Sequence, residues 1–192
     1  SIIANMLKVI DNLIIGGGMA YTFILSSGGK IGDSICEPES LGDCQEIIDQ
    51  AKEKNVKIFL PIDVIVSQSF SNNDKQKEVD IQNIPDGWQG LDIGTKTRKK
   101  FADVIKQSNT ILWNGPMGVF EMSSFQSGTK AVANAVAVAT KKGSFSLVGG
   151  GDSVAAVKKF NLKDKISFIS TGGGAMLESL EGKVLPGIKA LQ

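Results

Sequence analysis

The sequence predicts an α/β protein, a Rossmann-like three-layer sandwich built around a mainly parallel sheet. Two observations predict this class. Short apolar runs alternate with segments of helical periodicity along the 192 residues, and three of these runs lead directly into a glycine triplet followed by another helical segment. Strands and helices that alternate at this spacing are typical of right-handed strand–helix–strand units. We see no domain boundary inside residues 1–192.

The predicted strands are apolar runs of three or four residues without polar alternation, as expected for strands buried on both faces of a parallel sheet. Four such runs cover residues 13–15, 110–113, 145–148 and 166–169. A fifth run, 57–66, is interrupted by Pro61 and Asp63. The polar stretch 69–90 is rich in Asn, Asp, Lys and Gln. We expect it to be a surface excursion with short antiparallel strands.

Apolar residues spaced three or four apart predict the helices. These segments are 41–51, 95–107, 132–139 and 175–180. Thr95 is the expected N-cap of the second, and Gly143 and Gly182 end the last two. The chain opens in helical sequence that leads into a strand, an order that normally follows an earlier strand. We therefore expect the sheet to lack its first strand and the chain to be part of a longer protein.

Glycine triplets follow three of the strands, at 16–18, 149–151 and 172–174. In an open parallel sheet, ligands bind beyond the carboxyl ends of the strands. A helix N-terminus there offers free N–H groups, and glycine lets a phosphate approach them without meeting a Cβ. Three triplets on one edge favour a polyphosphate site over glycines that serve tight turns alone.

The glycine pattern does not match two familiar nucleotide motifs. No GxxxxGK[ST] string occurs, and Tyr21 falls where a GxGxxG fingerprint needs its last glycine.

Asp152 follows a triplet, where it could hold Mg²⁺ against phosphates or cap the next helix. Asn114 and Pro116 form a turn after a strand, and Glu121 follows; these three could contact a nucleotide or be ordinary loop residues.

The composition argues against nucleic-acid-binding, membrane-spanning and secreted proteins. Hydrophobic residues make up 42% and charged residues 21%, as in globular proteins, and the net charge of +1 predicts no nucleic-acid partner. No run approaches the ~18 apolar residues of a membrane span. Two cysteines eight positions apart and an opening without a signal peptide predict a cytoplasmic protein with reduced thiols. The absence of histidine removes the commonest general base and zinc ligand.

Six strings occur in order along the chain: IIGGGMAYTF, LPIDVIV, GWQGLDIGTKT, LWNGPMGVFE, GGGDSVAAV and STGGGAMLESLEGKVLPGI. Together they resemble the phosphoglycerate kinase family over nearly the whole length. The resemblance implies the carboxyl-terminal, nucleotide-binding lobe, residues 1–192, of a two-lobed glycolytic kinase that is monomeric and cytoplasmic. It implies reversible phosphoryl transfer from 1,3-bisphosphoglycerate to ADP, giving 3-phosphoglycerate and ATP, with Mg²⁺ on the nucleotide.

The resemblance also implies a role for each residue of the site. The adenine pocket would be lined by Gly16, Gly17, Gly18, Tyr21, Ile35, Gly94 and Val119. The phosphates would lie against Asn114, Pro116, Gly150, Gly151 and Ser153, the last also through its hydroxyl. Glu121 would take the ribose hydroxyls and Asp152 the magnesium ion. The helix opened by Gly172, Gly173 and Gly174 would face the transferring phosphoryl group, which makes these the catalytic glycines.

The chain departs from the family pattern at its start. The family carries phosphate-binding lysines just before the opening helix, and a first lobe that binds phosphoglycerate; Ser1 begins after both. We therefore expect the chain alone to be inactive. Two alternatives remain: an NAD-binding lobe of a dehydrogenase, which NADH binding would reveal, and a non-catalytic interaction fragment, which would bind no nucleotide.

Overall fold

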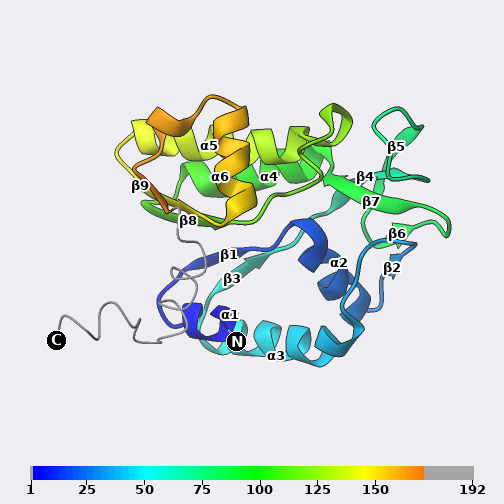
Figure 1. The fold of residues 1–192 in the computed structure, drawn as a ribbon. Helices are drawn as coiled ribbons and strands as arrows, with labels where there is room; N and C mark the ends of the chain where they lie inside the picture. Colours follow the sequence, from blue (N-terminus) through cyan, green and yellow to red (C-terminus); the bar gives the residue numbers. More distant parts are fainter. Residues whose placement is uncertain (1, 171–192) are drawn as a thin grey trace, which may run out of the picture.

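The computed structural model describes residues 2–170, and these form three layers (Figure 1). Parallel strands form the middle layer and helices cover both of its sides. The predicted α/β class with parallel sheets is therefore confirmed. The third glycine triplet and the helix predicted after it lie outside the described residues.

The described parallel strands form two hydrogen-bonded ladders. In one, β1 (Asn12–Ile14) pairs with β3 (Lys57–Phe59). In the other, β8 (Thr110–Asn114), β9 (Phe145–Gly149) and β10 (Phe168–Ser170) lie in the order β10-β9-β8. β1, β8, β9 and β10 match predicted apolar runs to within two residues, and β3 covers the first three residues of the predicted run 57–66. All of them point the same way within their ladder, so their carboxyl ends share an edge.

Two groups of helices cover the middle layer (Figure 1). One group comprises α1 (Ile2–Met6), α2 (Gly17–Ser26) and α3 (Leu41–Glu53). The other comprises α4 (Thr95–Lys106), α5 (Ser127–Lys141) and α6 (Gly151–Lys159). Short 3₁₀ turns occur at Pro38–Ser40, Ser123–Phe125 and Lys163–Lys165.

Alternation along β1 and β3 divides the core between the two helical layers. Leu13 and Ile58 pack against the cluster formed by α1, α2 and α3. Their neighbours Ile14 and Phe59 pack against the larger cluster under α4, α5 and α6. Successive side chains of a strand point to opposite faces, so each strand contributes to both cores. Burial on both faces explains why the predicted runs are apolar throughout.

A small antiparallel sheet beside α2 includes part of the polar stretch 69–90. It comprises β4 (Asp63–Ser67), β5 (Gln76–Asp80) and β7 (Gln89–Ile93) in the order β5-β4-β7. A two-residue parallel pair joins β2 (Lys30–Ile31) to β6 (Asn83–Ile84). The break at Pro61 is real, because the run 57–66 divides into β3 and β4, which belong to different sheets.

The start of α4 differs from the sequence prediction. The N-cap is Gly94, one residue before Thr95, and its missing side chain cannot cap the helix. Asp63 on β4 supplies the cap instead: its carboxylate accepts the backbone N–H groups of Lys96 and Thr97, both at 2.8 Å. The cap therefore comes from a residue 34 positions away from Thr97, beyond the reach of a local sequence pattern.

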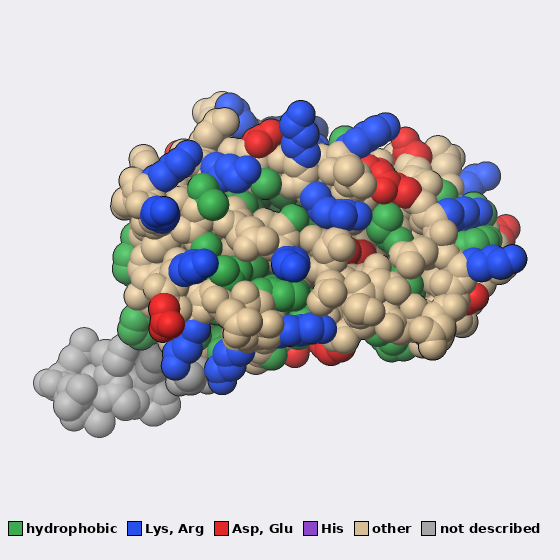
Figure 2. All heavy atoms as spheres, turned by 90° about the horizontal axis from the view of Figure 1, so that it is seen from above, with side chains coloured by type: hydrophobic (Ala, Val, Ile, Leu, Met, Phe, Trp, Pro, Cys, Tyr) green, Lys and Arg blue, Asp and Glu red, His purple; other side chains and the backbone are tan. Residues whose placement is uncertain are grey.

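The outer face of α4, α5 and α6 is basic. Figure 2, which looks down on this layer, shows more Lys and Arg than Asp and Glu side chains. A positive face favours the approach of anions. None of the helices in the described part of the chain is long and apolar enough to cross a membrane.

Candidate functional site

The first glycine turn links β1 to α2. Gly16 is the N-cap of α2 and Gly17 follows in the left-handed region at φ +62°. A Cβ on Gly17 would lie 2.6 Å from the carbonyl oxygen of Pro116, and one on Gly16 would collide with Met117. Glycine is therefore needed here both for the turn and for close contact with the loop after β8.

The second glycine turn links β9 to α6. Gly150 is the N-cap of α6 at φ +87°, and a Cβ there would collide with the side-chain oxygen of Asn114. Asp152 lies in the first turn of the helix, exposed, and has no hydrogen-bond partner among the described residues. The alternative that Asp152 serves as the cap is therefore wrong, and its carboxylate is open to solvent.

The turn of residues 114–117 lies between the two glycine turns. Its Gly115, at φ +97°, donates its N–H to the Ser153 hydroxyl at 2.6 Å, and its carbonyl accepts from Trp113 Nε1 at 2.7 Å. Farther along, the N–H of Met117 donates to Thr129 Oγ1 at 3.0 Å. The turn touches the α6 N-terminus at one end and the α2 N-terminus at the other, which brings both triplets to one edge.

A cleft of about 360 Å³ opens beside the first glycine turn. It is lined by Gly17, Gly18, Tyr21, Ile35, Phe70, Gln89, Gly90, Leu91, Pro116, Met117, Gly118 and Val119. Most of these are glycines or apolar residues. Ile35 and Phe70 are 69% and 62% exposed, an unusual state for large apolar side chains. An apolar slot with exposed apolar edges suits a flat aromatic ring.

Phe70 was missed by the sequence analysis because it lies in the polar stretch 69–90. Its loop is fixed to the far side of the cleft through Asn72. The Asn72 amide donates to Ser123 Oγ at 3.0 Å, and the Ser124 N–H donates to the Asn72 side-chain oxygen at 2.9 Å. An aromatic residue in an otherwise hydrophilic loop was the one available signal.

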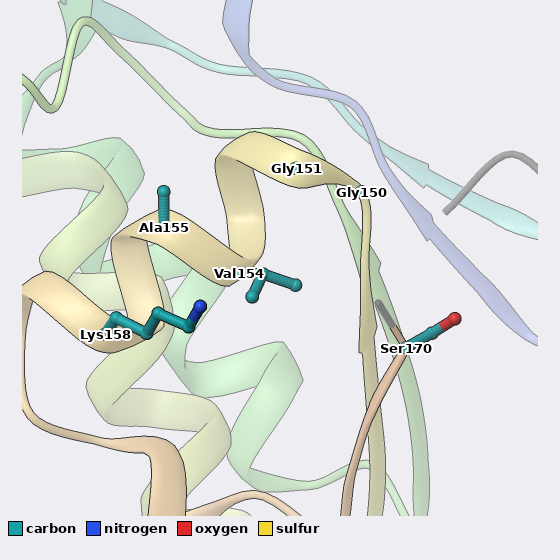
Figure 3. A pocket seen from close by; sticks show the side chains of 6 residues that line it. All are labelled: Gly150, Gly151, Val154, Ala155, Lys158 and Ser170. Atoms are coloured by element: carbon teal, nitrogen blue, oxygen red, sulfur yellow. The ribbon is translucent and has the colours of Figure 1, made fainter. Parts of the chain in front are cut away.

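A second hollow, of about 300 Å³, lies at the N-terminus of α6. It is lined by Gly150, Gly151, Val154, Ala155, Lys158 and Ser170. Figure 3 shows the Lys158 side chain pointing back along the helix toward Val154, with Ser170 across the hollow on β10. A helix N-terminus and an ammonium group both attract anions, so the polar end of a ligand fits here.

Asp92 on β7 lies beneath both the cleft loop and the start of α5. It is 1% exposed, and its carboxylate accepts the N–H groups of Gly128 at 2.8 Å and Ile93 at 2.9 Å. Burial raises the pKa of Asp92 to about 7, although those N–H donors oppose the shift. Burial, together with the negative charge of Asp92, also raises the pKa of Tyr21 in the cleft wall.

The raised pKa of Asp92 predicts a pH-dependent stability. Between the unfolded value near 4 and the folded value near 7, the folded state keeps a proton that the unfolded state has lost. The contribution of Asp92 is thus fully present below pH 4 and is lost progressively as the pH rises to the folded pKa of about 7. Relative to Asp92→Asn, the free energy of unfolding of the wild type should fall by about 2 kcal/mol from pH 5 to pH 7.

Urea denaturation of both proteins at each pH measures this difference, in which the other titrating groups cancel. A constant offset would show that the N–H donors of Gly128 and Ile93 keep the carboxylate ionised throughout. A pH-independent difference in stability between the two proteins is also expected, since asparagine offers an N–H₂ group where one of those donors needs an acceptor. The change in this difference with pH is what tests the pKa of Asp92.

Of the residues predicted for the site, Gly17, Gly18, Tyr21, Ile35, Pro116 and Val119 line the cleft, and Gly150 and Gly151 line the hollow at the start of α6. Gly94 is buried against the Asp63 carboxylate and does not line the cleft. Ser153 is fully buried and its hydroxyl accepts the N–H of Gly115, so its contact with a phosphate stays a prediction. Gly172, Gly173 and Gly174 lie outside the described residues. Glu121 is exposed at the end of the cleft loop.

The residues of this edge fit a metal ion that arrives with its ligand. Within residues 2–170, no group of three or more acidic, Cys or His side chains could hold a metal by itself. Mg²⁺ commonly takes one or two carboxylates and completes its shell with waters and phosphate oxygens. The exposed Asp152 carboxylate beside the free amides of α6 meets that requirement.

These features define a class of protein: an α/β fold whose glycine-rich strand ends meet beside an apolar cleft. The sequence profile described as phosphoglycerate kinase matches residues 1–183, and the chain belongs to the phosphoglycerate kinase family. The structure of phosphoglycerate kinase from Coxiella burnetii is similar at 46% identity and TM-score 0.94, covering 99% of this chain and 48% of that one.

The crystal structure of phosphoglycerate kinase from Pyrococcus horikoshii OT3 is similar at 31% identity and TM-score 0.82. The match covers 100% of this chain and 48% of the Pyrococcus horikoshii chain. The chain therefore spans about half the length of these two enzymes.

Proposed function

We propose that the chain is the carboxyl-terminal, nucleotide-binding lobe of a phosphoglycerate kinase. The lobe binds MgADP or MgATP in the cleft and along the N-terminus of α6. The observation that carries this proposal is the contact of both glycine turns with residues 114–117. Because that turn touches Gly17 at one end and Gly150 at the other, one extended ligand can lie across it.

The geometry favours one orientation of the nucleotide. The base lies in the apolar cleft between the exposed side chains of Ile35 and Phe70. The phosphates lie toward Gly150 and Gly151, where the helix N-terminus offers amide donors and a positive dipole end. Asp152 would hold Mg²⁺, which neutralises the charge of the phosphates when it is bound. Without that cation the carboxylate would repel the ligand.

The reaction can proceed by direct transfer between the two substrates, without a covalent intermediate on the protein. A β-phosphate oxygen of ADP attacks the acyl phosphorus of 1,3-bisphosphoglycerate; the new P–O bond forms as the bond to the carboxyl oxygen breaks. 3-Phosphoglycerate leaves as a carboxylate and no proton is transferred. A chain without histidine is compatible with this chemistry, because the nucleophile is already an anion. Catalysis then rests on positioning and on charge stabilisation, in which the glycines 172–174 would take part.

The proposal assigns the second substrate to another part of the enzyme. Phosphoglycerate would be bound by the other lobe, and the whole enzyme would be a cytoplasmic monomer. We expect this chain alone to bind nucleotide without turning it over, because the transfer requires both substrates to be held together.

Titration calorimetry tests the binding role. The chain should bind ADP with a dissociation constant at or below about 1 mM in the presence of magnesium, and more weakly in EDTA. NADH, the ligand of a dehydrogenase lobe, should bind at least about tenfold more weakly. No heat from ADP at millimolar concentration would rule the proposal out, and preferential NADH binding would replace it with the dehydrogenase alternative.

A further inference from the structure

The loop that carries Glu121 ends in a tight turn. The N–H of Met122 donates to the carbonyl of Val119 at 3.0 Å, so Phe120 and Glu121 are its two central residues. The hydrogen bond of a turn does not use the carbonyls of its central residues. Both carbonyl oxygens are therefore available to a donor from elsewhere in the molecule.

Lys159, the last residue of α6, supplies that donor. Its ammonium donates to the Phe120 carbonyl at 2.6 Å and to the Glu121 carbonyl at 3.1 Å. The same nitrogen lies 5.9 Å from the centre of the buried Phe120 ring. A charged donor shared by two carbonyls and a ring face holds a turn in one position more firmly than a neutral contact does.

Lys159 lies at the opposite end of α6 from the residues proposed to bind the phosphates. The first turn of α6 carries Gly151 and Asp152, and the other end carries Lys159. A helix of this length is a rigid rod of roughly 13 Å. Lys159 therefore fixes the turn with Glu121 relative to the N-terminus of α6, which is proposed to hold the phosphates. The turn is thereby also fixed relative to the ribose of a nucleotide bound there.

We infer that Lys159 is a positioning residue that sets the selectivity of the site for a ribose with free hydroxyls. It acts on Glu121, which the proposed function places against those hydroxyls, and the inference rests on that function. If Lys159 merely closed the end of α6, its loss would weaken all nucleotides alike. If it positions Glu121, its loss weakens only ligands that have ribose hydroxyls.

The test compares ADP with 2′,3′-dideoxy-ADP, both with magnesium, by titration calorimetry on the chain. In Lys159→Met, which keeps an apolar stem, the affinity for ADP should fall about fivefold to tenfold, while that for dideoxy-ADP stays within about twofold. The control Lys163→Met removes an exposed lysine from a nearby 3₁₀ turn and should change neither affinity. Both ligands bind the same folded fraction, so their ratio remains valid even if Lys159→Met is partly unfolded.

Two further variants decide the outcome. Lys159→Arg keeps the charge and can donate to both carbonyls, so it should keep the wild-type ratio. In a Glu121→Ala background, Lys159→Met should have no further effect on ADP. An equal loss for both ligands, or an additional loss in that background, would overturn the inference while leaving ADP binding by the wild type intact. Absence of wild-type ADP binding is a different result, which contradicts the proposed function.

Discussion

Asp152→Asn should abolish the magnesium dependence of ADP binding without unfolding the chain. The affinity for MgADP is expected to fall about tenfold to a hundredfold, and the affinity for ADP in EDTA should stay the same or rise. The carboxylate is exposed in the first turn of α6 and has no hydrogen-bond partner in residues 2–170, so the fold does not depend on it.

The change in affinity for ADP without magnesium tests whether the Asp152 carboxylate lies beside the phosphates. A carboxylate beside the phosphates repels them when no cation lies between, so neutralising it should help ADP bind without magnesium. Asp164→Asn is a matched control, because it removes an exposed acidic group from the 3₁₀ turn after α6 and should leave both affinities unchanged. If Asp152→Asn weakens ADP equally with and without magnesium, Asp152 contacts the nucleotide in some other way and is not the metal ligand.

The strand–glycine–helix units were predictable because their signals are local. Each apolar run, its triplet and the following helix occupy fewer than about twenty consecutive residues, and burial on both faces removes ambiguity about the strand. The triplets 16–18 and 149–151 therefore fall at the strand ends, as expected. Sequence alone did not show that residues 114–117 touch both, since that contact depends on how the two ladders pack.

The contacts that the sequence did not reveal are made by residues far apart in the chain. The Ser153 hydroxyl accepts a part-buried hydrogen bond from the N–H of Gly115, 38 positions away. Thr95 has the residue type of an N-cap, yet Asp63 caps the helix from a neighbouring strand. Local propensity suggested Thr95 as the cap, whereas tertiary packing determined that Asp63 takes this role.

Asp63→Ala should destabilise the chain by about 3–5 kcal/mol, among the larger effects of a single substitution. The carboxylate is 5% exposed and accepts the N–H of Lys96, the N–H of Thr97 and the Thr97 hydroxyl, the last at 2.5 Å. Alanine leaves these donors at the start of α4 without their acceptor. Because β4 is joined to α4 through them, the loss affects both the helix and the central strand of the antiparallel sheet.

The same contacts give the effect a pH dependence. Burial alone would raise the pKa of the Asp63 carboxyl, but the hydrogen bonds from Thr97 and Lys96 leave it below its usual value. A lowered pKa means that the stabilisation is fully present above the unfolded value, near pH 4, and is lost as the pH falls through the folded value. The difference in stability between wild type and Asp63→Ala should therefore be constant from pH 5 to pH 8 and shrink in stronger acid.

Urea denaturation at pH 7 and at pH 3 measures both parts of this prediction. Asp103→Ala, an exposed position on the same helix, is the matched control and should change stability by less than about 0.5 kcal/mol. A loss in Asp63→Ala no larger than this control would mean that water satisfies the N-terminus of α4 and that Asp63 is not its cap. A full loss at pH 7 that persists unchanged at pH 3 would place the effect in packing against Gly94, because only the ionised carboxylate is a strong acceptor for three donors.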